Sequence, residues 1–386
     1  RALRAGGRTD AALTVLAAPE ATGAERARLD LARFEVHVAR GDAAGARAAV
    51  ASLPDPLPAG LVVAAAAALT EMGENRRALV VLRDDRSAPA QALRARALVF
   101  TGRATEADAL AEGLLDHPDP VVAARAHEVR STVAWHHGQA ADALRFARLG
   151  LERIDARQPA LEADLRRAEG AACFYALDFE SAERALEAAL ATNRRLDRVP
   201  ALVKCLNNLA MVAYAGGDWE RAATCWDEGL LLCARLEDPV ELAIAFNNVG
   251  YLHLRRGNLL RADRLFRRCI HEASRAGFPR VLPVAWSNLG EASLLRGDLL
   301  GAAEALAHAE VGLADTPRGA DHHELARRLV QLDLARGRTG RARRSLEGLV
   351  RDPGPAGLGA EWGHVLRLRA ICAIETAPAE ARRLAS

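Results

Sequence analysis

The sequence predicts an all-α protein built from repeated pairs of helices. Half of the residues are apolar and only 4% are aromatic, and Ala, Leu and Arg dominate, which suits closely packed helices better than sheets. A turn signal, usually glycine, recurs ten times, and an alanine follows each one after five residues. Repeats of this kind extend one core lengthwise, so the 386 residues need not form separate globular domains.

The recurring turn residue sets the register of the repeats. Glycine occupies nine of these turns and Leu177 the tenth; the turn residues are Gly7, Gly41, Gly73, Gly102, Gly138, Leu177, Gly217, Gly257, Gly297 and Gly337. The alanines that follow are Ala12, Ala46, Ala78, Ala107, Ala143, Ala182, Ala222, Ala262, Ala302 and Ala342. A small side chain is needed where the second helix of a pair crosses the first, because the two backbones approach closely there.

Each repeat is expected to hold a first helix, a tight turn and a second helix. Glycine ends the first helix in a left-handed conformation, and a following Asp or Asn can cap the second helix. The candidate caps are Asp42, Asp218, Asn258 and Asp298. Four residues after the alanine, a large apolar side chain should fill the space between the helices, as at Leu186, Trp226, Phe266, Leu306 and Leu346.

The spacing of the turns divides the chain into three predicted segments. Residues 1–160 hold irregular repeats with steps of 34, 32, 29, 36 and 39, whereas residues 161–350 repeat every 40 residues. Residues 351–386 begin with the loop "RDPGPAGLGAEWG" and continue into a shortened eleventh repeat. Because the chain starts at Arg1 in what reads as the end of a helix, we interpret it as a fragment of a longer protein.

The regular segments "NNVGYLHLRRGNLLRADRLFRRC" and "SNLGEASLLRGDLLGAAEALAHA" resemble the tetratricopeptide repeat. His253 and Ser293 replace the usual aromatic residue of the first helix, and Cys269 replaces the last alanine. The 40-residue period is similar to the subclass found in kinesin light chains, G-protein-signalling scaffolds and bacterial regulators. The resemblance implies a right-handed superhelical solenoid of antiparallel helix pairs, with about ten repeats and a concave groove lined by the first helices.

Composition excludes several classes of protein. The 52 basic and 50 acidic residues leave a net charge of +2, so no global field attracts nucleic acid or an acidic membrane. The longest apolar run, residues 61–69, is too short to span a bilayer, and no signal peptide is recognisable. Six scattered cysteines without CxxC pairs fit a reducing cytoplasm, and the use of Arg in place of Lys indicates a bacterial source.

The sequence offers no catalytic or metal-binding motif that we can assign. Adjacent histidines at 136–137 and 322–323 point about 100° apart on a helix, and "HHE" lacks the four-residue spacing of a zinc protease helix. Cys225 and Cys269 fall at core positions, and "GPAGLG" at 354–359 follows no strand. We therefore expect no enzyme activity, no cofactor and no metal. The basic run 327–346 carries no interleaved aromatics, so we expect a solvated face there rather than a nucleic-acid site.

Recognition residues are expected on one face of the first helices. When the turn residue is numbered 15 within each repeat, positions 2, 5, 9, 12 and 13 share the face that should line the groove. This face carries amide, charged, Tyr and Met side chains, as a recognition surface would. The predicted ligand-binding residues are Arg167, Lys204, Asn207, Met211, Tyr214, Asn247, Tyr251, Arg255, Ser287, Glu291 and Arg327.

The paired asparagines are expected to have two different roles. A position-5 amide, as in Asn207 and Asn247, can match the N–H and C=O of an extended chain, and the resemblance to kinesin light chains and peptide-pheromone receptors implies that use. Position 6 points toward the first helix of the neighbouring repeat. There, Asn208, Asn248 and Asn288 could bridge repeats or lie at the edge of the groove, and we favour the bridge.

Together these features predict a scaffold or sensor module that binds a protein or peptide, as part of a larger bacterial regulatory protein. One alternative is a self-assembly or autoinhibitory element that holds part of its own chain. A third interpretation is a non-catalytic appendage of an enzyme. We expect no membrane partner, and the sequence does not determine the oligomeric state.

Overall fold

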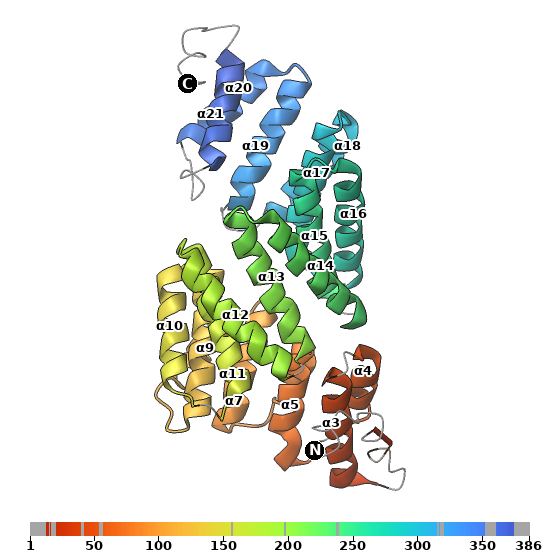
Figure 1. Ribbon diagram of the computed structural model, residues 1–386, viewed down its shortest axis with the longest axis vertical. Helices are drawn as coiled ribbons and strands as arrows, with labels where there is room; N and C mark the ends of the chain where they lie inside the picture. The colour runs from red at the N-terminus through yellow and green to blue at the C-terminus, as the bar shows by residue number, and fades with distance from the viewer. Residues whose placement is uncertain are drawn as a thin grey trace. The chain divides into compact units, whose positions relative to one another are not determined.

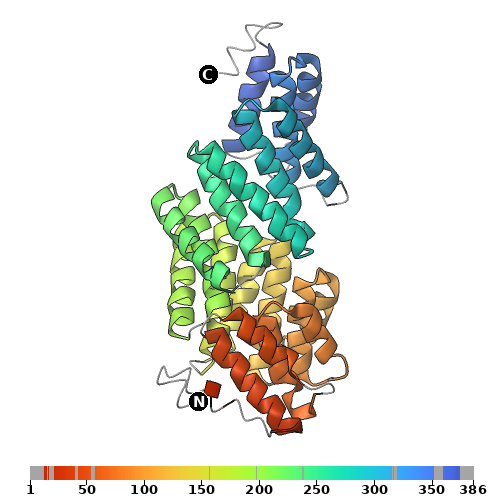
Figure 2. The same ribbon diagram turned by 90° about the vertical axis from the view of Figure 1, so that its right-hand side faces the viewer.

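The computed structural model describes residues 13–14, 16, 21–39, 42–53, 57–155, 157–196, 198–236, 239–314, 316, 320–351 and 360–373. Across these ranges, all regular secondary structure is helical (Figures 1 and 2). The chain divides into two compact units, Arg1–Asp238 and Pro239–Ser386, which we call unit 1 and unit 2 and describe separately. No helix among the described residues has the length and apolar character needed to cross a membrane.

Unit 1 alternates first helices with second helices that are short in the early repeats and reach 17 and 18 residues in α12 and α14. Its first helices are α3 (Gly23–Ala39), α5 (Val62–Glu71), α7 (Ala88–Phe100), α9 (Pro120–His136), α11 (Pro159–Tyr175) and α13 (Val199–Ala215). Its second helices are α4 (Ala43–Ala51), α6 (Asn75–Val81), α8 (Ala104–Glu112), α10 (Ala140–Glu152), α12 (Phe179–Arg195) and α14 (Trp219–Leu236). The early second helices have only 7 to 9 residues against 17 in α12, which explains the short and irregular spacing of the first turns.

Unit 2 continues the alternation with more uniform helices. Its first helices are α15 (Pro239–Arg255), α17 (Leu282–Leu295), α19 (Ala320–Ala335) and α21 (Ala360–Ala373). Its second helices are α16 (Leu259–Arg275), α18 (Leu299–Leu313) and α20 (Thr339–Arg351). Short 3₁₀ turns precede α5 in unit 1 (Ala59–Leu61) and α17 in unit 2 (Pro279–Val281).

Small residues and large apolar residues pack against each other within each pair. The nine repeat alanines that the structure describes, Ala46 to Ala342, are all fully buried, and Phe266 and Leu306 are buried beside them. A Cβ on Gly250 of α15 would lie 2.8 Å from the Phe266 ring, and one on Gly290 of α17 would lie 2.6 Å from Leu306. The predicted small-to-large packing is therefore confirmed, and it explains why glycine stands in the middle of these first helices.

The turns confirm the predicted register, with one correction to the capping. Glycine adopts positive φ at seven described turns, from Gly73 to Gly337, and Leu177 does so at φ 61°; Gly7, Gly41 and Ala12 lie outside the described residues. Asp42, Asp218 and Asp298 accept backbone N–H groups as predicted, and Asp178 does the same. The side chain of Asn258 makes no cap, because it lies 3.5 Å from Nδ1 of His253 instead.

The predicted loop after residue 350 needs a second correction. Helix α21 begins at Ala360, so the last four residues of the expected loop 351–363 are helical. Ala360 and Glu361 favour helix and follow the run of Pro and Gly residues at 353–359, and the helix tolerates the single Gly363. Residues 352–359 lie outside the described part. The predicted boundaries at 160 and 350 concern the regularity of the repeats, and they stay predictions beside the division at residue 238.

Candidate functional site

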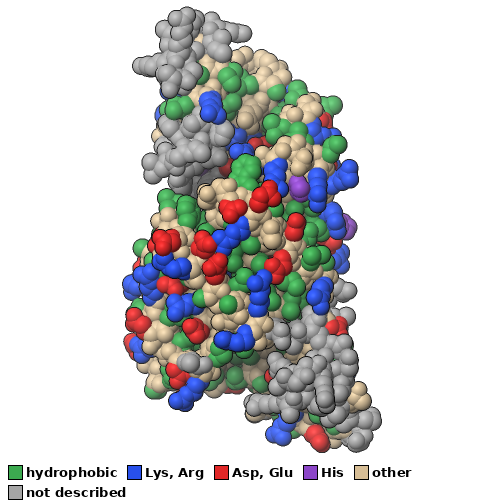
Figure 3. All heavy atoms as spheres, viewed as in Figure 1, with side chains coloured by type: hydrophobic (Ala, Val, Ile, Leu, Met, Phe, Trp, Pro, Cys, Tyr) green, Lys and Arg blue, Asp and Glu red, His purple; other side chains and the backbone are tan. Residues whose placement is uncertain are grey.

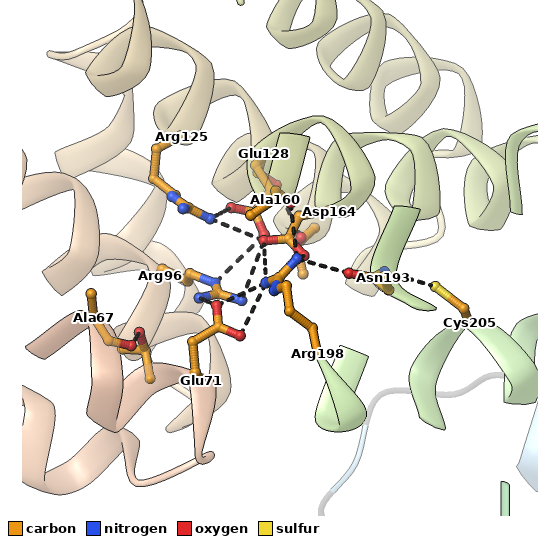
Figure 4. Close-up of polar contacts among 12 residues, drawn as sticks. Ala67, Glu71, Arg96, Arg125, Glu128, Ala160, Asp164, Asn193, Arg198 and Cys205 are labelled. Carbon is orange, nitrogen blue, oxygen red and sulfur yellow. Dashed lines mark hydrogen bonds and ion pairs between the residues drawn. The ribbon is translucent and has the colours of Figure 1, made fainter. Parts of the chain in front are cut away.

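The candidate site in each unit is the face formed by positions 2, 5, 9, 12 and 13 of its first helices, which we call the first-helix face. In unit 1 this face carries six buried or half-buried charged side chains, the unit 1 charge cluster (Figure 4). Its members are Glu71 of α5, Arg96 of α7, Arg125 and Glu128 of α9, Asp164 of α11, and Arg198 directly before α13. Five of the six occupy first-helix face positions of four repeats.

Arg198 connects the most distant parts of the cluster. One terminal nitrogen donates to the Ala160 carbonyl at 2.9 Å and to Asp164 at 3.1 Å. The other donates to both carboxylate oxygens of Glu71, at 2.9 and 3.0 Å, across 127 residues of sequence. Arg198 also donates to Oδ1 of Asn193, whose Nδ2 in turn lies 3.6 Å from the Cys205 sulfur. One side chain therefore fixes the spacing of helices α5, α11 and α12.

Arg96 and Arg125 complete the cluster from α7 and α9. Arg125 donates to Glu128 at 2.8 Å and lies 3.4 Å from Asp164. Arg96 lies 3.5 Å from Glu71, 3.6 Å from Glu128 and 3.9 Å from Asp164. The side chains of Glu128 and Asp164 are only 3% and 5% exposed. Three guanidinium groups thus face three carboxylates, and the formal charge of the cluster is zero.

The electrostatics keep four groups of the cluster ionised: Asp164, Glu71, Arg96 and Arg198. Burial raises the pKa of the Asp164 carboxyl, but the guanidinium groups of Arg198, Arg96 and Arg125 outweigh burial and hold that pKa below its usual range. The same balance lowers the pKa of Glu71, with Arg198 as the main opposing charge. The carboxylates in turn raise the pKa of Arg96 and of Arg198 against the effect of burial. A balanced cluster of this kind holds helices together more readily than it binds a charged ligand.

The structure places the predicted residues of unit 1 on α11 and α13. Asn207 accepts a hydrogen bond from the Trp226 indole at 3.1 Å, and the Tyr214 ring stacks on Trp219 with centroids 5.9 Å apart. The Lys204 ammonium lies 5.4 Å from the centroid of the Phe100 ring. These three, together with Arg167, Asn208 and Met211, are half-buried. Their assignment to ligand binding stays a prediction.

In unit 2 the asparagines form a hydrogen-bonded ladder across repeats. Asn288 of α17 donates to Oδ1 of Asn247 of α15 at 3.0 Å, and Asn247 donates to Asn248 at 3.2 Å. Arg328 of α19 donates to Oδ1 of Asn288 at 3.0 Å. Asn247 is 9% exposed and uses both ends of its amide within the chain, so a ligand would have to replace one of these bonds. The ladder connects the first helices of three successive repeats.

Beside the ladder lie five charged side chains, the unit 2 charge cluster: Arg255, Glu291, Glu324, Arg327 and Arg328. Arg328 lies 2.6 Å from both Glu291 and Glu324 and also donates to Ser287. Arg327 lies 3.8 Å from Glu291 and 3.7 Å from Glu324, and Arg255 lies 3.9 Å from Glu291. Three guanidinium groups thus share two carboxylates, which leaves a formal charge of +1.

Accessibility differs among the members of this cluster. Arg327 and Arg328 are 5% and 2% exposed, and Glu291 is 7% exposed. The side chains of Arg255 and Glu324 are 37% and 27% exposed, so they form the accessible border of the cluster. Burial raises the pKa of Glu291, but Arg328 and Arg327 outweigh burial and lower it, so this carboxylate stays ionised. The Tyr251 ring lies beside Arg255, with its centroid 6.0 Å from the guanidinium.

Sequence reasoning missed part of both clusters. Arg328 occupies position 6 of its repeat, as Asn208, Asn248 and Asn288 do in theirs. This shared position would have predicted Arg328 as a member of the network. Most of the unit 1 charge cluster lies in the irregular repeats. Glu71, Arg96, Arg125 and Glu128 fall at positions 13, 9, 2 and 5 once each repeat is counted back from its own turn. Arg198 precedes its helix, and its position in the repeat gives no signal.

The described residues show little that could support catalysis. No group of three or more His, Cys, Asp or Glu side chains in this part of the chain could hold a metal ion. Burial raises the pKa of five cysteine thiols, Cys173, Cys205, Cys225, Cys269 and Cys372, and raises that of Cys269 to about 12. The buried His127 of α9 has a lowered pKa, chiefly because of burial, and neither of its ring nitrogens has a hydrogen-bond partner. It packs beside Phe146 in the core between α9 and α10.

Comparison with solved structures identifies the architecture as a helical-repeat solenoid. The apo quorum sensor NprR from B. thuringiensis has a TM-score of 0.62 at 13% identity, over 84% of this chain and 95% of that one. A Rap protein complexed with Competence and Sporulation Factor has a TM-score of 0.60 at 15% identity, over 94% and 97%. A signal transduction ATPase with a tetratricopeptide repeat sensor from Pyrococcus horikoshii has 0.53 at 12%, over 81% and 51%.

At these identities the likeness defines the fold alone. No protein-family model matches the sequence, and no curated protein does. The class of protein that the helices define is a helical-repeat solenoid of paired helices.

Proposed function

We propose that this chain is a binding module of a larger bacterial regulatory protein in the cytoplasm, without catalysis of its own. It captures an extended peptide or partner segment, and the first-helix face of unit 2 makes the principal contacts. The single observation that carries this proposal is the amide ladder with the exposed side chain of Arg255 beside it. The solved structures of a quorum sensor and of a Rap protein bound to a factor support a recognition role for this fold.

The chemistry of this face selects an extended segment that carries a carboxylate. The amides of Asn247 and Asn288 can exchange an intrachain bond for a backbone N–H or C=O of the ligand, at little net loss of hydrogen bonding. The guanidinium of Arg255 favours a negative group, and its side chain is exposed, so such a group can approach it. Tyr251 offers an apolar surface beside it. In unit 1, Lys204, Asn207, Met211 and Tyr214 are proposed to add contacts of the same kind.

The test is fluorescence polarisation of the whole chain with a pooled library of short unstructured peptides, prepared with free and with amidated C-termini. We expect Arg255→Gln to weaken binding of the free-carboxylate pool roughly tenfold, equivalent to about 1.4 kcal/mol. We expect Asn207→Ala combined with Asn247→Ala to abolish binding of both pools. Arg264→Gln, an exposed arginine on second helix α16, is the matched control and should change nothing.

Two results would contradict the proposal. Equal binding of the two pools would remove the role of the surplus charge. Unchanged binding by the double asparagine variant would remove the role of the amides. Size-exclusion chromatography of the same variants separates both results from the self-assembly alternative, because self-association that is insensitive to these substitutions would favour that alternative.

A further inference from the structure

The turn between α11 and α12 in unit 1 carries a leucine where the other turns carry glycine. Leu177 has φ 61°, and among the described residues it is the one non-glycine residue with positive φ. This conformation is strained for a residue with a Cβ, and glycine would relieve the strain. Leu177 is nevertheless 75% exposed, so packing within the chain does not offset the strain. Strain kept at an exposed apolar residue is typical of a functional position.

Aromatic rings contact one another around the turn that carries Leu177. The Tyr175 ring meets Trp135 of α9 edge to face with centroids 5.8 Å apart, and it meets Phe174 at 5.4 Å. Phe174 lies 5.9 Å from Phe179, the first residue of α12, and both pack against the buried core. The Tyr175 side chain is 53% exposed. Only 4% of the chain is aromatic, so abundance does not explain this gathering. We call Leu177 and the four aromatic residues, Trp135, Phe174, Tyr175 and Phe179, the aromatic turn patch.

The patch has an acidic border. Asp178, directly before α12, and Glu180, Glu183 and Glu187 on α12 lie within ten residues of sequence. Figure 3 shows acidic and basic side chains interspersed on this face of the molecule. Arg184 pairs with Glu180, and Arg221 pairs with Glu183 and Glu187. Four carboxylates against two guanidinium groups leave a formal charge of −2. Carboxylates and aromatic faces both attract cations, so the border and the patch favour the same kind of partner.

We propose that the aromatic turn patch is a docking surface for a basic amphipathic helix of a partner protein. A helix with a leucine stripe flanked by arginines presents both of the required groups on one side. Its leucines would pack against Leu177 and Tyr175, and its guanidinium groups would stack on the aromatic rings and pair with Glu180 and Glu183. This surface belongs to unit 1, whereas the principal contacts of the proposed peptide site lie in unit 2.

The test measures fluorescence anisotropy of two synthetic helices with the whole chain. One probe has a leucine stripe flanked by arginines, and its twin carries glutamates in place of the arginines. We expect the arginine probe to bind roughly tenfold or more tightly than its twin, and Leu177→Gly to weaken it roughly tenfold. Because glycine suits φ 61°, the melting temperature of this variant should stay the same or rise. Tyr175→Ala should weaken binding as well, and Leu300→Ala, at a leucine 81% exposed in unit 2, should not.

Three outcomes would overturn the proposal. The first is equal binding of the two probes, and the second is unchanged binding by Leu177→Gly. The third is self-association of the chain, seen by light scattering and lost in Leu177→Gly, because the occupant of the patch would then be a second copy of the chain. Weakened binding by Leu177→Gly together with an unchanged or higher melting temperature would support it, since a purely structural role cannot produce that combination.

Discussion

Unit 1 and unit 2 both place arginines and carboxylates on their first-helix faces, but the two sets differ in balance. In unit 1, three guanidinium groups meet three carboxylates, and Arg198 connects α11 to α5 across 127 residues. In unit 2, three guanidinium groups share Glu291 and Glu324, and asparagines continue the network. The same face of the same kind of repeat has therefore produced a neutral cluster in one unit and a cationic one in the other.

This difference shows how a repeat can change its use without changing its fold. Each buried charge must be paired, because an unpaired one is costly to remove from water. A cluster that meets this requirement internally, as in unit 1, stabilises the array and leaves little for a ligand to satisfy. In unit 2, Arg255 lies at the exposed border of its cluster, and this is where the proposed ligand would approach.

The same substitution in the two clusters should give opposite results for stability. Arg198→Gln leaves the Asp164 and Glu71 carboxylates short of a buried partner, so we expect a loss of about 3–5 kcal/mol in the free energy of unfolding. Arg255→Gln in unit 2 removes the surplus charge at an exposed position, and we expect a change of about 1 kcal/mol or less. Urea denaturation of both variants measures the difference. Equal losses would show that charge balance does not distinguish the units.

Acid should weaken unit 1 more than unit 2, because the unit 1 cluster holds two carboxyls with a lowered pKa, Asp164 and Glu71, and the unit 2 cluster holds one, Glu291. The pKa values of Asp164 and Glu71 are lowered in the folded state, so the unfolded chain binds more protons below the ordinary carboxyl range near pH 4. Their contribution to stability is present above that range and is lost as the pH falls through the folded-state values. Hydrogen exchange of the whole chain as the pH is lowered from 5 to 3, read by mass spectrometry, should show α5 and α11 losing protection before α17. Simultaneous loss would count against this ranking.

The fold could be predicted from sequence because it depends on local spacing. A turn glycine, an alanine five residues later and a bulky residue four further on each meet a steric need inside one helix pair. Gly257, Ala262 and Phe266 are therefore recognisable without any knowledge of distant residues. The clusters were only partly predictable, because their partners are set by contacts between repeats. Glu291 and Arg327 were found by register, whereas nothing in the local sequence connects Arg198 with Glu71.

The amide ladder of unit 2 should contribute less than the charge cluster of unit 1. Asn288→Ala removes the buried hydrogen-bond partner of Oδ1 of Asn247 and of one Arg328 nitrogen. We expect a loss of about 1–3 kcal/mol in the free energy of unfolding. Asn258→Ala is the control, because this exposed turn residue does not cap its helix. Thermal unfolding of both variants provides the measurement. If the two substitutions had equal effects, the ladder would have no structural role.

The smallest expected effect concerns His127 in the core of unit 1. Burial lowers its pKa, and Arg153, Arg130 and Arg145 lower it further, while Asp116 opposes them. Because the folded-state pKa lies below the unfolded value near 6.5, the neutral ring stabilises the fold above pH 6.5, and this contribution is lost as the pH falls through the folded-state pKa. His127→Leu removes two buried ring nitrogens that lack partners, so stability at pH 7 should stay equal or rise by up to about 1 kcal/mol.

The decisive measurement for His127 is the slope of stability against pH. Urea midpoints taken between pH 7 and 5 should fall less steeply for His127→Leu than for the parent chain. In the parent, His127 binds a proton in the unfolded state more readily than in the folded state over this range. His137→Gln, at an exposed histidine ten residues along the chain, should keep the parent slope. A parent-like slope in His127→Leu would mean that other groups set the pH dependence in this range. The unit 1 charge cluster affects stability at lower pH, where Asp164 and Glu71 take up protons.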